Sequence, residues 1–241
     1  MAFKARIENG IVYSPYPSEA VPELPLYQVV KQSLEQHGDR IALVCEDKEI
    51  TSAELLKMFQ RYAAGFQLNG IKKGDKVLVH LENSLENLIA MYSIIFAGGI
   101  AVLSFPAFNN DDILYKIRDS NASYIFTSEI EAKKMRDFRK KFNIKGYFAT
   151  GIAEGFVSVS EFKNLNENTY RKVPVEDVKN EAVMLVYSSG TTGRPKTIEH
   201  THYSIVARLP SGCHYLFDDQ DIIASWISIT TLLGFRLYLC A

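Results

Sequence analysis

The sequence has 241 residues, of which 47% are hydrophobic and 23% charged. These values are typical of a globular protein and exclude a disordered, collagen-like or disulfide-scaffold chain. The 27 lysines and arginines nearly balance the 28 aspartates and glutamates, so no surplus of positive charge favours nucleic acid or an acidic membrane as a partner.

The cysteines predict a reducing, intracellular compartment, because they are odd in number and show no Cys-x-x-Cys spacing: Cys45, Cys213 and Cys240. Residues 1–10 contain no apolar core of a secretory signal, so we expect no signal peptide. Cys45 falls in a predicted strand and is expected to be a small buried side chain.

The first third of the chain begins with a proline-dotted segment, residues 1–24, which is predicted to form an extended N-terminal lead. A helix is predicted from Leu26 to a C-terminal Gly38, followed by a hairpin over residues 41–50. Thr51-x-x-Glu54 is a capping-box pattern, and the helix it opens is expected to stop before Gly70.

Strands and helices then alternate along the chain. Strands are predicted at 77–81, 100–105, 124–127 and 182–187, with helices at 84–97, 110–120 and 130–142. Residues 146–173 are predicted to be a loop-rich connection. Because such alternation implies parallel crossovers, the predicted fold class is α/β, with a layered sheet and flanking helices.

One uncharged run, residues 88–108, is long enough to span a bilayer. Gly98-Gly99 divides it into a helical half and a β-rich half, and Pro106 closes the second half. We therefore favour a buried helix, a glycine turn and a buried strand over a membrane span.

A basic segment, residues 133–141, carries six lysines and arginines. Met135, Phe138 and Phe142 lie at helical spacing within and just after it. The pattern favours the solvated face of an amphipathic helix over a nucleic-acid patch.

A Ser/Thr/Gly-rich segment directly after the apolar strand 182–187 carries the strongest functional signal. Its glycines permit backbone N–H groups to converge on an anion, its hydroxyls are small donors, and its lysine adds a positive charge. The predicted phosphate ligands are Ser188, Ser189, Gly190, Thr191, Thr192, Gly193 and Lys196. The spacing differs from a Walker A loop. The alternative interpretation is an ordinary exposed turn.

The segment YSSGTTGRPK, residues 187–196, resembles the phosphate-binding signature of the adenylate-forming superfamily, which includes acyl-CoA synthetases, 4-coumarate–CoA ligases and beetle luciferases. Similarity to that family extends from about residue 25 to the C-terminus. It includes the segments ITSAEL (50–55), LENS (81–84), AGGI (97–100), FPAF (105–108) and Thr201-His202.

The resemblance implies that ATP and a carboxylic acid form an acyl-adenylate and pyrophosphate, and that the acyl group usually passes to coenzyme A. It implies Mg²⁺ as well, although no ligand for it is assignable, and no catalytic residue is assignable in this chain. The implied partners are a small carboxylic acid, ATP and CoA, and the implied location is cytoplasmic or peroxisomal.

The sequence departs from the family pattern after a strand predicted near residues 222–224. Thr230 or Thr231 stands where a histidine is common, and with Gly234 these residues are the candidates for the acyl pocket. Thr197 and Glu199 replace the usual glycine and apolar residue after the lysine.

The later family elements have no counterpart in these 241 residues. We therefore expect residues 25–241 to be a partial N-terminal domain of a longer enzyme, without its C-terminal half and small lid domain, and with little or no turnover alone. The alternative is a truncated or degenerate paralogue that binds a nucleotide or a protein partner without catalysis.

A metal site is a weaker hypothesis, because its potential ligands do not match a familiar zinc spacing: His200, His202, Cys213 and His214. Two further histidines, His37 and His80, are expected to be surface or sheet residues.

Overall fold

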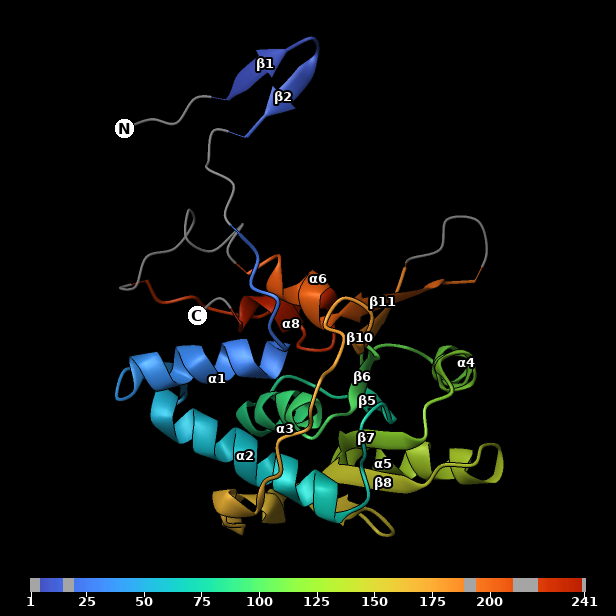
Figure 1. The fold of residues 1–241 in the computed structure, drawn as a ribbon. Helices are drawn as coiled ribbons and strands as arrows, with labels where there is room; N and C mark the ends of the chain where they lie inside the picture. The colour runs from blue at the N-terminus through green and yellow to red at the C-terminus, as the bar shows by residue number, and fades with distance from the viewer. Residues whose placement is uncertain (1–4, 15–19, 189–193, 210–220, 240–241) are drawn as a thin grey trace.

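A computed structural model describes residues 5–14, 20–188, 194–209 and 221–239. Its centre is a seven-stranded sheet with the strand order β11-β10-β6-β5-β7-β8-β9 (Figure 1). Six strands are parallel and β11 is antiparallel to β10. The strands are β5 (Lys76–His80), β6 (Ile100–Leu103), β7 (Tyr124–Ser128), β8 (Gly146–Thr150), β9 (Val157–Ser158), β10 (Ala182–Tyr187) and β11 (Thr197–Thr201). The predicted α/β class is confirmed.

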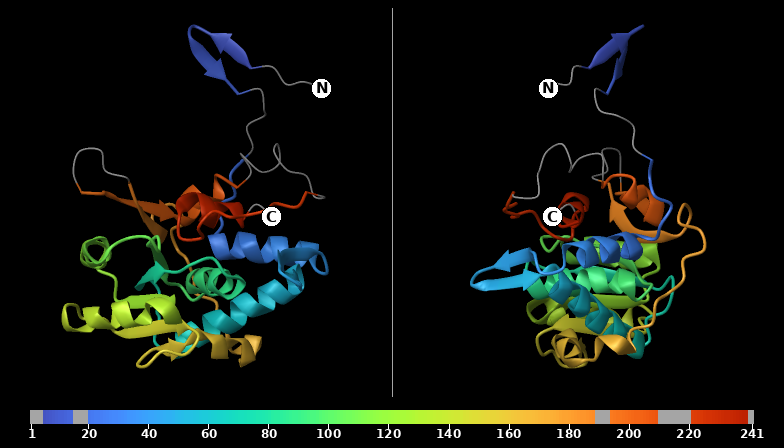
Figure 2. Two further views of the ribbon diagram at one scale, coloured as in Figure 1. Left: turned by 180° about the vertical axis from the view of Figure 1, so that it is seen from behind. Right: turned by 60° about the vertical axis from the view of Figure 1, so that its left-hand side comes forward.

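Helices cover both faces of this sheet. One face is covered by α1 (Leu26–His37), α2 (Ser52–Leu68) and α3 (Leu85–Phe96), and the other by α4 (Asn110–Ser120) and α5 (Glu129–Arg136) (Figures 1 and 2). Side chains alternate between the faces along each strand. In β5, Val77 and Val79 pack with the first group of helices, whereas Leu78 packs with the second.

Local capping fixes where several helices begin. Thr51 and Glu54 form the predicted capping box at the start of α2, with Glu54 N donating to Thr51 Oγ1 at 3.2 Å. Ser84 caps α3, since its hydroxyl accepts from Asn87 N at 3.1 Å. The starts of α2 and α3 that the sequence predicts are therefore the ones observed in the structure.

The uncharged run forms α3, a glycine turn and β6, as predicted. Gly98 has φ +88°, in the left-handed region that favours glycine. A Cβ on Gly99 would lie 2.8 Å from a methyl group of Ile94, so the close packing at this turn also favours glycine at position 99. Within the described ranges, no helix has the length and apolar character needed to cross a membrane.

The connection at residues 146–173 is more ordered than predicted. It supplies β8 and β9 to the main sheet, followed by the short 3-10 helices η2 (Val159–Asn164) and η3 (Glu167–Thr169). Because β8 has only three buried residues in succession, its apolar signal is short. Tertiary pairing with β7 makes it a strand.

The helix predicted at 130–142 is shorter than expected. It ends at Arg136 and continues as the 3-10 helix η1 (Asp137–Lys140). Met135 and Phe138 are buried while Lys133 is exposed, which confirms an amphipathic element with a solvated basic side.

Two small hairpins lie outside the main sheet. β1 (Arg6–Glu8) and β2 (Ile11–Tyr13) pair within the predicted lead, with positive φ at the turn residues Asn9 and Gly10, and stand away from the body (Figure 1). The second hairpin, predicted at 41–50, consists of β3 (Ile41–Cys45) and β4 (Lys48–Thr51). Cys45 is exposed, so the prediction of a buried cysteine was wrong. This hairpin projects from the body (Figure 2).

The C-terminal part contributes α6 (His202–Val206) and α8 (Leu232–Leu237). Residues 221–226 form no strand, and Ile222 and Trp226 are 92% and 84% exposed. The strand predicted near residues 222–224 was therefore wrong, because no described strand pairs with this segment.

Candidate functional site

The Ser/Thr/Gly-rich segment, residues 188–196, is the connection between β10 and β11 at the carboxyl end of β10. Tyr187 and Thr197 are the last pair of the hairpin. Beyond that pair, Ser188 N donates to Lys196 O and Lys196 N donates to Ser188 Oγ, both at 3.0 Å. These two bonds close the base of a loop that we call the phosphate loop, after the ligand predicted for it from the sequence.

Of the predicted phosphate ligands, the structure brings Ser188 and Lys196 together at this base. Ser188 is half-buried and Lys196 is exposed, and the contact between them joins the main chain of Lys196 to the main chain and hydroxyl of Ser188. A hydroxyl and an ammonium group are donor types that suit an anion such as a phosphate, and the phosphate role of these two residues stays a prediction. The other five, Ser189, Gly190, Thr191, Thr192 and Gly193, lie outside the described residues.

Helix α4 supports both ends of the phosphate loop. On the β10 side, Tyr187 OH donates to the carbonyl oxygen of Lys116 at 3.2 Å. On the β11 side, Tyr115 OH donates to Pro195 O at 2.9 Å, and the Thr197 hydroxyl donates to an Asp119 carboxylate oxygen. Residues on both sides of the loop therefore contact one helix, which sequence reasoning did not identify, since the two segments are about 80 residues apart.

Lys116 is a buried cation beneath this support. Its Nζ donates to Leu103 O at 3.1 Å and lies 3.8 Å from the centre of the Phe108 ring and 4.9 Å from that of Tyr187. Burial lowers its pKa to about 8. All these contacts lie in the wall between α4 and the sheet, so the ammonium group is a structural part of that wall.

A second polar cluster lies at the same sheet edge, where β5 and β6 end. His80 is fully buried and its Nδ1 is 3.1 Å from Ser104 Oγ. Its Nε2 lies 3.7 Å from a Glu131 carboxylate oxygen. Burial lowers the pKa of His80 to about 4, so its ring is neutral near pH 7. His80 is a sheet histidine, as expected, and the sequence signal for Ser104 is its place directly after a buried strand.

These residues mark a topological switch point of the sheet. β5 is followed by α3 on one face, whereas the adjacent β6 is followed by α4 on the other. Ligands of open α/β sheets bind in the crevice outside the carboxyl ends of strands at such a point. The phosphate loop lies at the same edge, one strand beyond β6.

The candidates for the acyl pocket build the start of α8. The Thr231 hydroxyl accepts from Gly234 N at 3.1 Å and donates to Ser228 O at 2.8 Å. Thr230 is buried, and its hydroxyl lies 2.9 Å from Ser228 Oγ. A Cβ on Gly234 would overlap the carbonyl oxygen of Ser228. The described contacts are thus local, and the pocket role of these three residues stays a prediction.

The possible metal ligands are not brought together in the described part of the chain. His202 Nδ1 accepts a hydrogen bond from Leu26 N at 3.1 Å, and His200 lies on β11. Cys213 and His214 lie outside the described residues. Within the described ranges, no group of three His, Cys, Asp or Glu side chains is placed to hold a metal ion.

This chain is similar in sequence to a known protein family and to individual proteins. The family model described as "AMP-binding enzyme" matches residues 30–241. A long-chain-fatty-acid–CoA ligase of Bacillus subtilis is 28% identical over 237 residues, which cover 86% of this chain and 42% of that protein. A 4-coumarate–CoA ligase of Vanilla planifolia is 27% identical over 212 residues, which cover 86% of this chain and 38% of that protein.

The fold is similar to that of a solved long-chain-fatty-acid–CoA ligase from Archaeoglobus fulgidus, with a TM-score of 0.83 and 20% identity. The matched region covers 93% of this chain and 46% of that structure. The chain thus spans about two fifths of the length of the curated relatives named above.

Proposed function

Because this chain belongs to the AMP-binding enzyme family, we propose that its phosphate loop binds the phosphates of ATP in a reaction that activates a carboxylic acid. The observation that carries the proposal is the closed loop base, where Ser188 and Lys196 meet at the carboxyl end of β10. The contacts of α4 with the residues on both sides of the loop favour the same role, because donors that are held in place stabilise charge that develops in a reaction.

In the proposed reaction a carboxylate oxygen of the acid attacks the α-phosphorus of ATP. The bond from that phosphorus to the bridging oxygen breaks, and pyrophosphate leaves with the negative charge. The Lys196 ammonium and the Ser188 hydroxyl would stabilise that charge. The acyl-adenylate would then transfer its acyl group to the thiol of coenzyme A, releasing AMP.

The proposed domain assignment is that residues 25–241 form part of the N-terminal domain of such an enzyme, preceded by a lead of residues 1–24. The share of the relatives that the chain covers supports this assignment. Mg²⁺ would accompany the ATP phosphates, and none of the residues described above is assigned to it.

The test is acid-dependent exchange of pyrophosphate into ATP by the native protein from its source, whose intact mass is measured first against the 27.2 kDa of this chain. Lys196→Ala should lower the exchange rate by at least about tenfold, because it removes a charge from the leaving group's site. Lys31→Ala is the matched control, since that half-buried lysine on α1 pairs only with Glu35 among the described residues. Wild-type exchange in Lys196→Ala would refute the loop assignment.

The same measurement separates the non-catalytic alternative. A paralogue that only binds nucleotide would retain ATP with an affinity that depends on Lys196, while showing no exchange with any carboxylic acid supplied. Exchange that requires an acid would exclude that alternative.

A further inference from the structure

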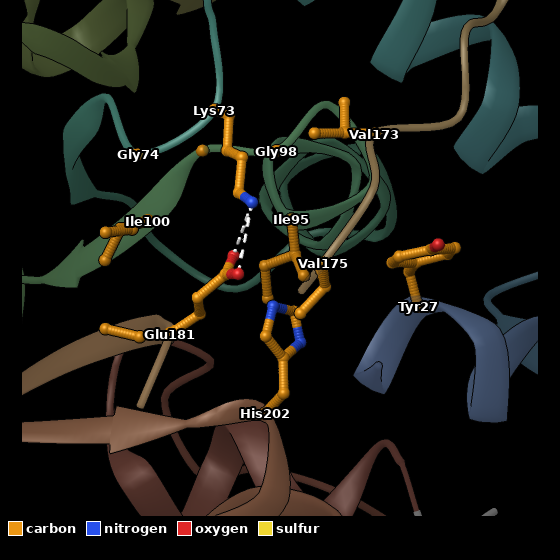
Figure 3. Close-up of a pocket in the computed structure, with 12 residues that line it drawn as sticks. Tyr27, Lys73, Gly74, Ile95, Gly98, Ile100, Val173, Val175, Glu181 and His202 are labelled. Atoms are coloured by element: carbon orange, nitrogen blue, oxygen red, sulfur yellow. Dashed lines mark hydrogen bonds and ion pairs between the residues drawn. The ribbon is translucent and has the colours of Figure 1, made fainter. Parts of the chain in front are cut away.

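A cavity of about 380 Å³ lies at the sheet edge opposite the phosphate loop (Figure 3). Its wall includes the first residues of two strands, Ile100 of β6 and Ala182 of β10. The five residue steps of β10 place it roughly 16 Å from the loop, at ~3.3 Å per residue. The cavity is therefore separate from the site proposed for ATP.

Part of the cavity wall is an ion pair whose charges cancel. The Lys73 ammonium lies 2.9 and 3.1 Å from the two carboxylate oxygens of Glu181. The same carboxylate accepts backbone N–H bonds from Glu176 at 2.8 Å and Asp177 at 3.1 Å. Glu181 is thus saturated with donors, whereas the ammonium group has a third hydrogen available.

His202 supplies a fixed donor to the cavity. Its side chain is held because Nδ1 accepts from Leu26 N at 3.1 Å, and only 6% of the residue is exposed. A neutral imidazole that accepts at Nδ1 carries its proton on Nε2, and burial lowers the pKa of His202 to about 4.

The hydrogen bond to Leu26 N occupies Nδ1 and leaves the Nε2–H group of His202 at the cavity wall. Figure 3 shows the imidazole between Glu181 and Val175, with its far edge turned into the cavity. A side chain that is held in place at a cavity wall can donate from its second ring nitrogen to a ligand that enters the cavity.

The rest of the wall is apolar. Ile95, Val173, Val175 and the buried Tyr27 line it together with the strand starts. Gly98 permits this arrangement, because a Cβ there would lie 2.9 Å from a methyl group of Val173. The cavity thus combines an apolar body with a small polar end, as small-molecule sites do.

We propose that this cavity binds a small neutral molecule with an apolar body and one oxygen that accepts hydrogen bonds from His202 Nε2–H and the Lys73 ammonium. An anionic head would lie beside the Glu181 carboxylate and compete with it for Lys73. A cationic head would lie beside Lys73 and leave the imidazole donor unsatisfied. Neutral amides and alcohols avoid both costs.

The test uses hexanamide as the probe and the 241-residue chain, with binding measured by calorimetry. A molecule of about eight non-hydrogen atoms should bind at a single site with a Kd of about 1 mM or tighter. Hexanoate, which has the same chain and a charged head, should bind at least about tenfold more weakly. No saturable binding of hexanamide, or tighter binding of hexanoate, would overturn the proposal.

Variants locate the site. Val175→Phe fills the cavity from a segment outside helices and strands and should abolish binding, whereas Val44→Phe makes the same change on the exposed β3 hairpin and should not alter it. His202→Asn keeps an acceptor for Leu26 N while removing the Nε2 donor, and should weaken binding about three- to tenfold. Circular dichroism confirms that each variant is folded. Wild-type affinity in folded Val175→Phe would place the binding elsewhere and refute the inference.

Discussion

Replacing Lys116 with methionine should remove a pH dependence that the wild-type protein carries in its free energy of unfolding. The lysine is 4% exposed, and burial lowers its pKa from 10.5 to about 8. Between these two values the unfolded chain binds a proton that the folded chain does not. The free energy of unfolding therefore rises with pH across this window and falls again as the pH is lowered toward 8.

The size of the effect follows from the shift. At 1.36 kcal/mol for each pKa unit, a fall from 10.5 to about 8 corresponds to about 3 kcal/mol. Below pH 8 the cost of burying the charge is fully present, partly offset by the bond to Leu103 O and the ring of Phe108. Methionine fills a similar volume and carries no charge, so the variant should lack this contribution at every pH.

The assay is urea unfolding of the wild type and of Lys116→Met near pH 7 and near pH 10. Subtracting the free energy of unfolding of the variant from that of the wild type cancels the titration of the groups that both proteins share. This difference should increase by about 2 to 3 kcal/mol from pH 7 to pH 10. Lys133→Met is the control, a change at an exposed lysine of α5. Its free energy of unfolding should change between the two pH values by as much as that of the wild type. Parallel behaviour of the wild type and Lys116→Met would refute the reasoning, because it would mean that the wall keeps this lysine charged throughout.

Three further changes test individual contacts. Thr51→Ala breaks the capping box of α2 and should lower the free energy of unfolding by about 1 kcal/mol in urea, while Thr51→Ser should restore it. Gly234→Ala places a methyl group against the carbonyl oxygen of Ser228 and should cost at least about 2 kcal/mol, seen as a lower midpoint of thermal unfolding; an unchanged midpoint would contradict that packing. Tyr115→Phe removes the bond to Pro195 O and should weaken ATP binding about three- to tenfold, measured by calorimetry, with the overall stability nearly unchanged.

The parts of the fold that sequence predicts are those where local and tertiary signals agree. The helix opened by Thr51 has both a capping box and a continuous apolar face, and its observed start matches the prediction. The turn at Gly98 separates a helix from a strand, and both its φ and its packing require glycine. In such places the chain has one favourable local structure, and the fold keeps it.

Strands that depend on their neighbours were harder to predict. β11 alternates threonine, isoleucine, glutamate and histidine, and it is a strand because β10 offers it a hydrogen-bonding edge. Cys45 belongs to an apolar run that a hairpin carries away from the core. An apolar run in the sequence does not show whether the strand that it forms will be covered by other elements or left exposed.

The sequence indicates the chemistry of the candidate site, which stays a prediction, and does not indicate which elements contact it. Nine consecutive residues, 188–196, point to an anion site from sequence alone, and Ser188 and Lys196 do lie together. The contacts from Tyr115 and Asp119 depend on how α4 crosses the sheet, and no spacing in the chain encodes that. The pairing of His80 with Ser104 likewise requires the register of two adjacent strands.

The hairpin of β10 and β11 allows the length of the phosphate loop at one end of the sheet to change without a change at the other end, where His202 lies. Its register is fixed by the pairs from Ala182 with Thr201 to Tyr187 with Thr197. Insertions between Ser188 and Lys196 would lengthen the loop without moving His202, because they lie beyond the last pair. A single-residue deletion within β11 would instead turn its side chains to the opposite face of the sheet. Natural or engineered length variation should therefore be tolerated at the turn and excluded from the strand that follows it.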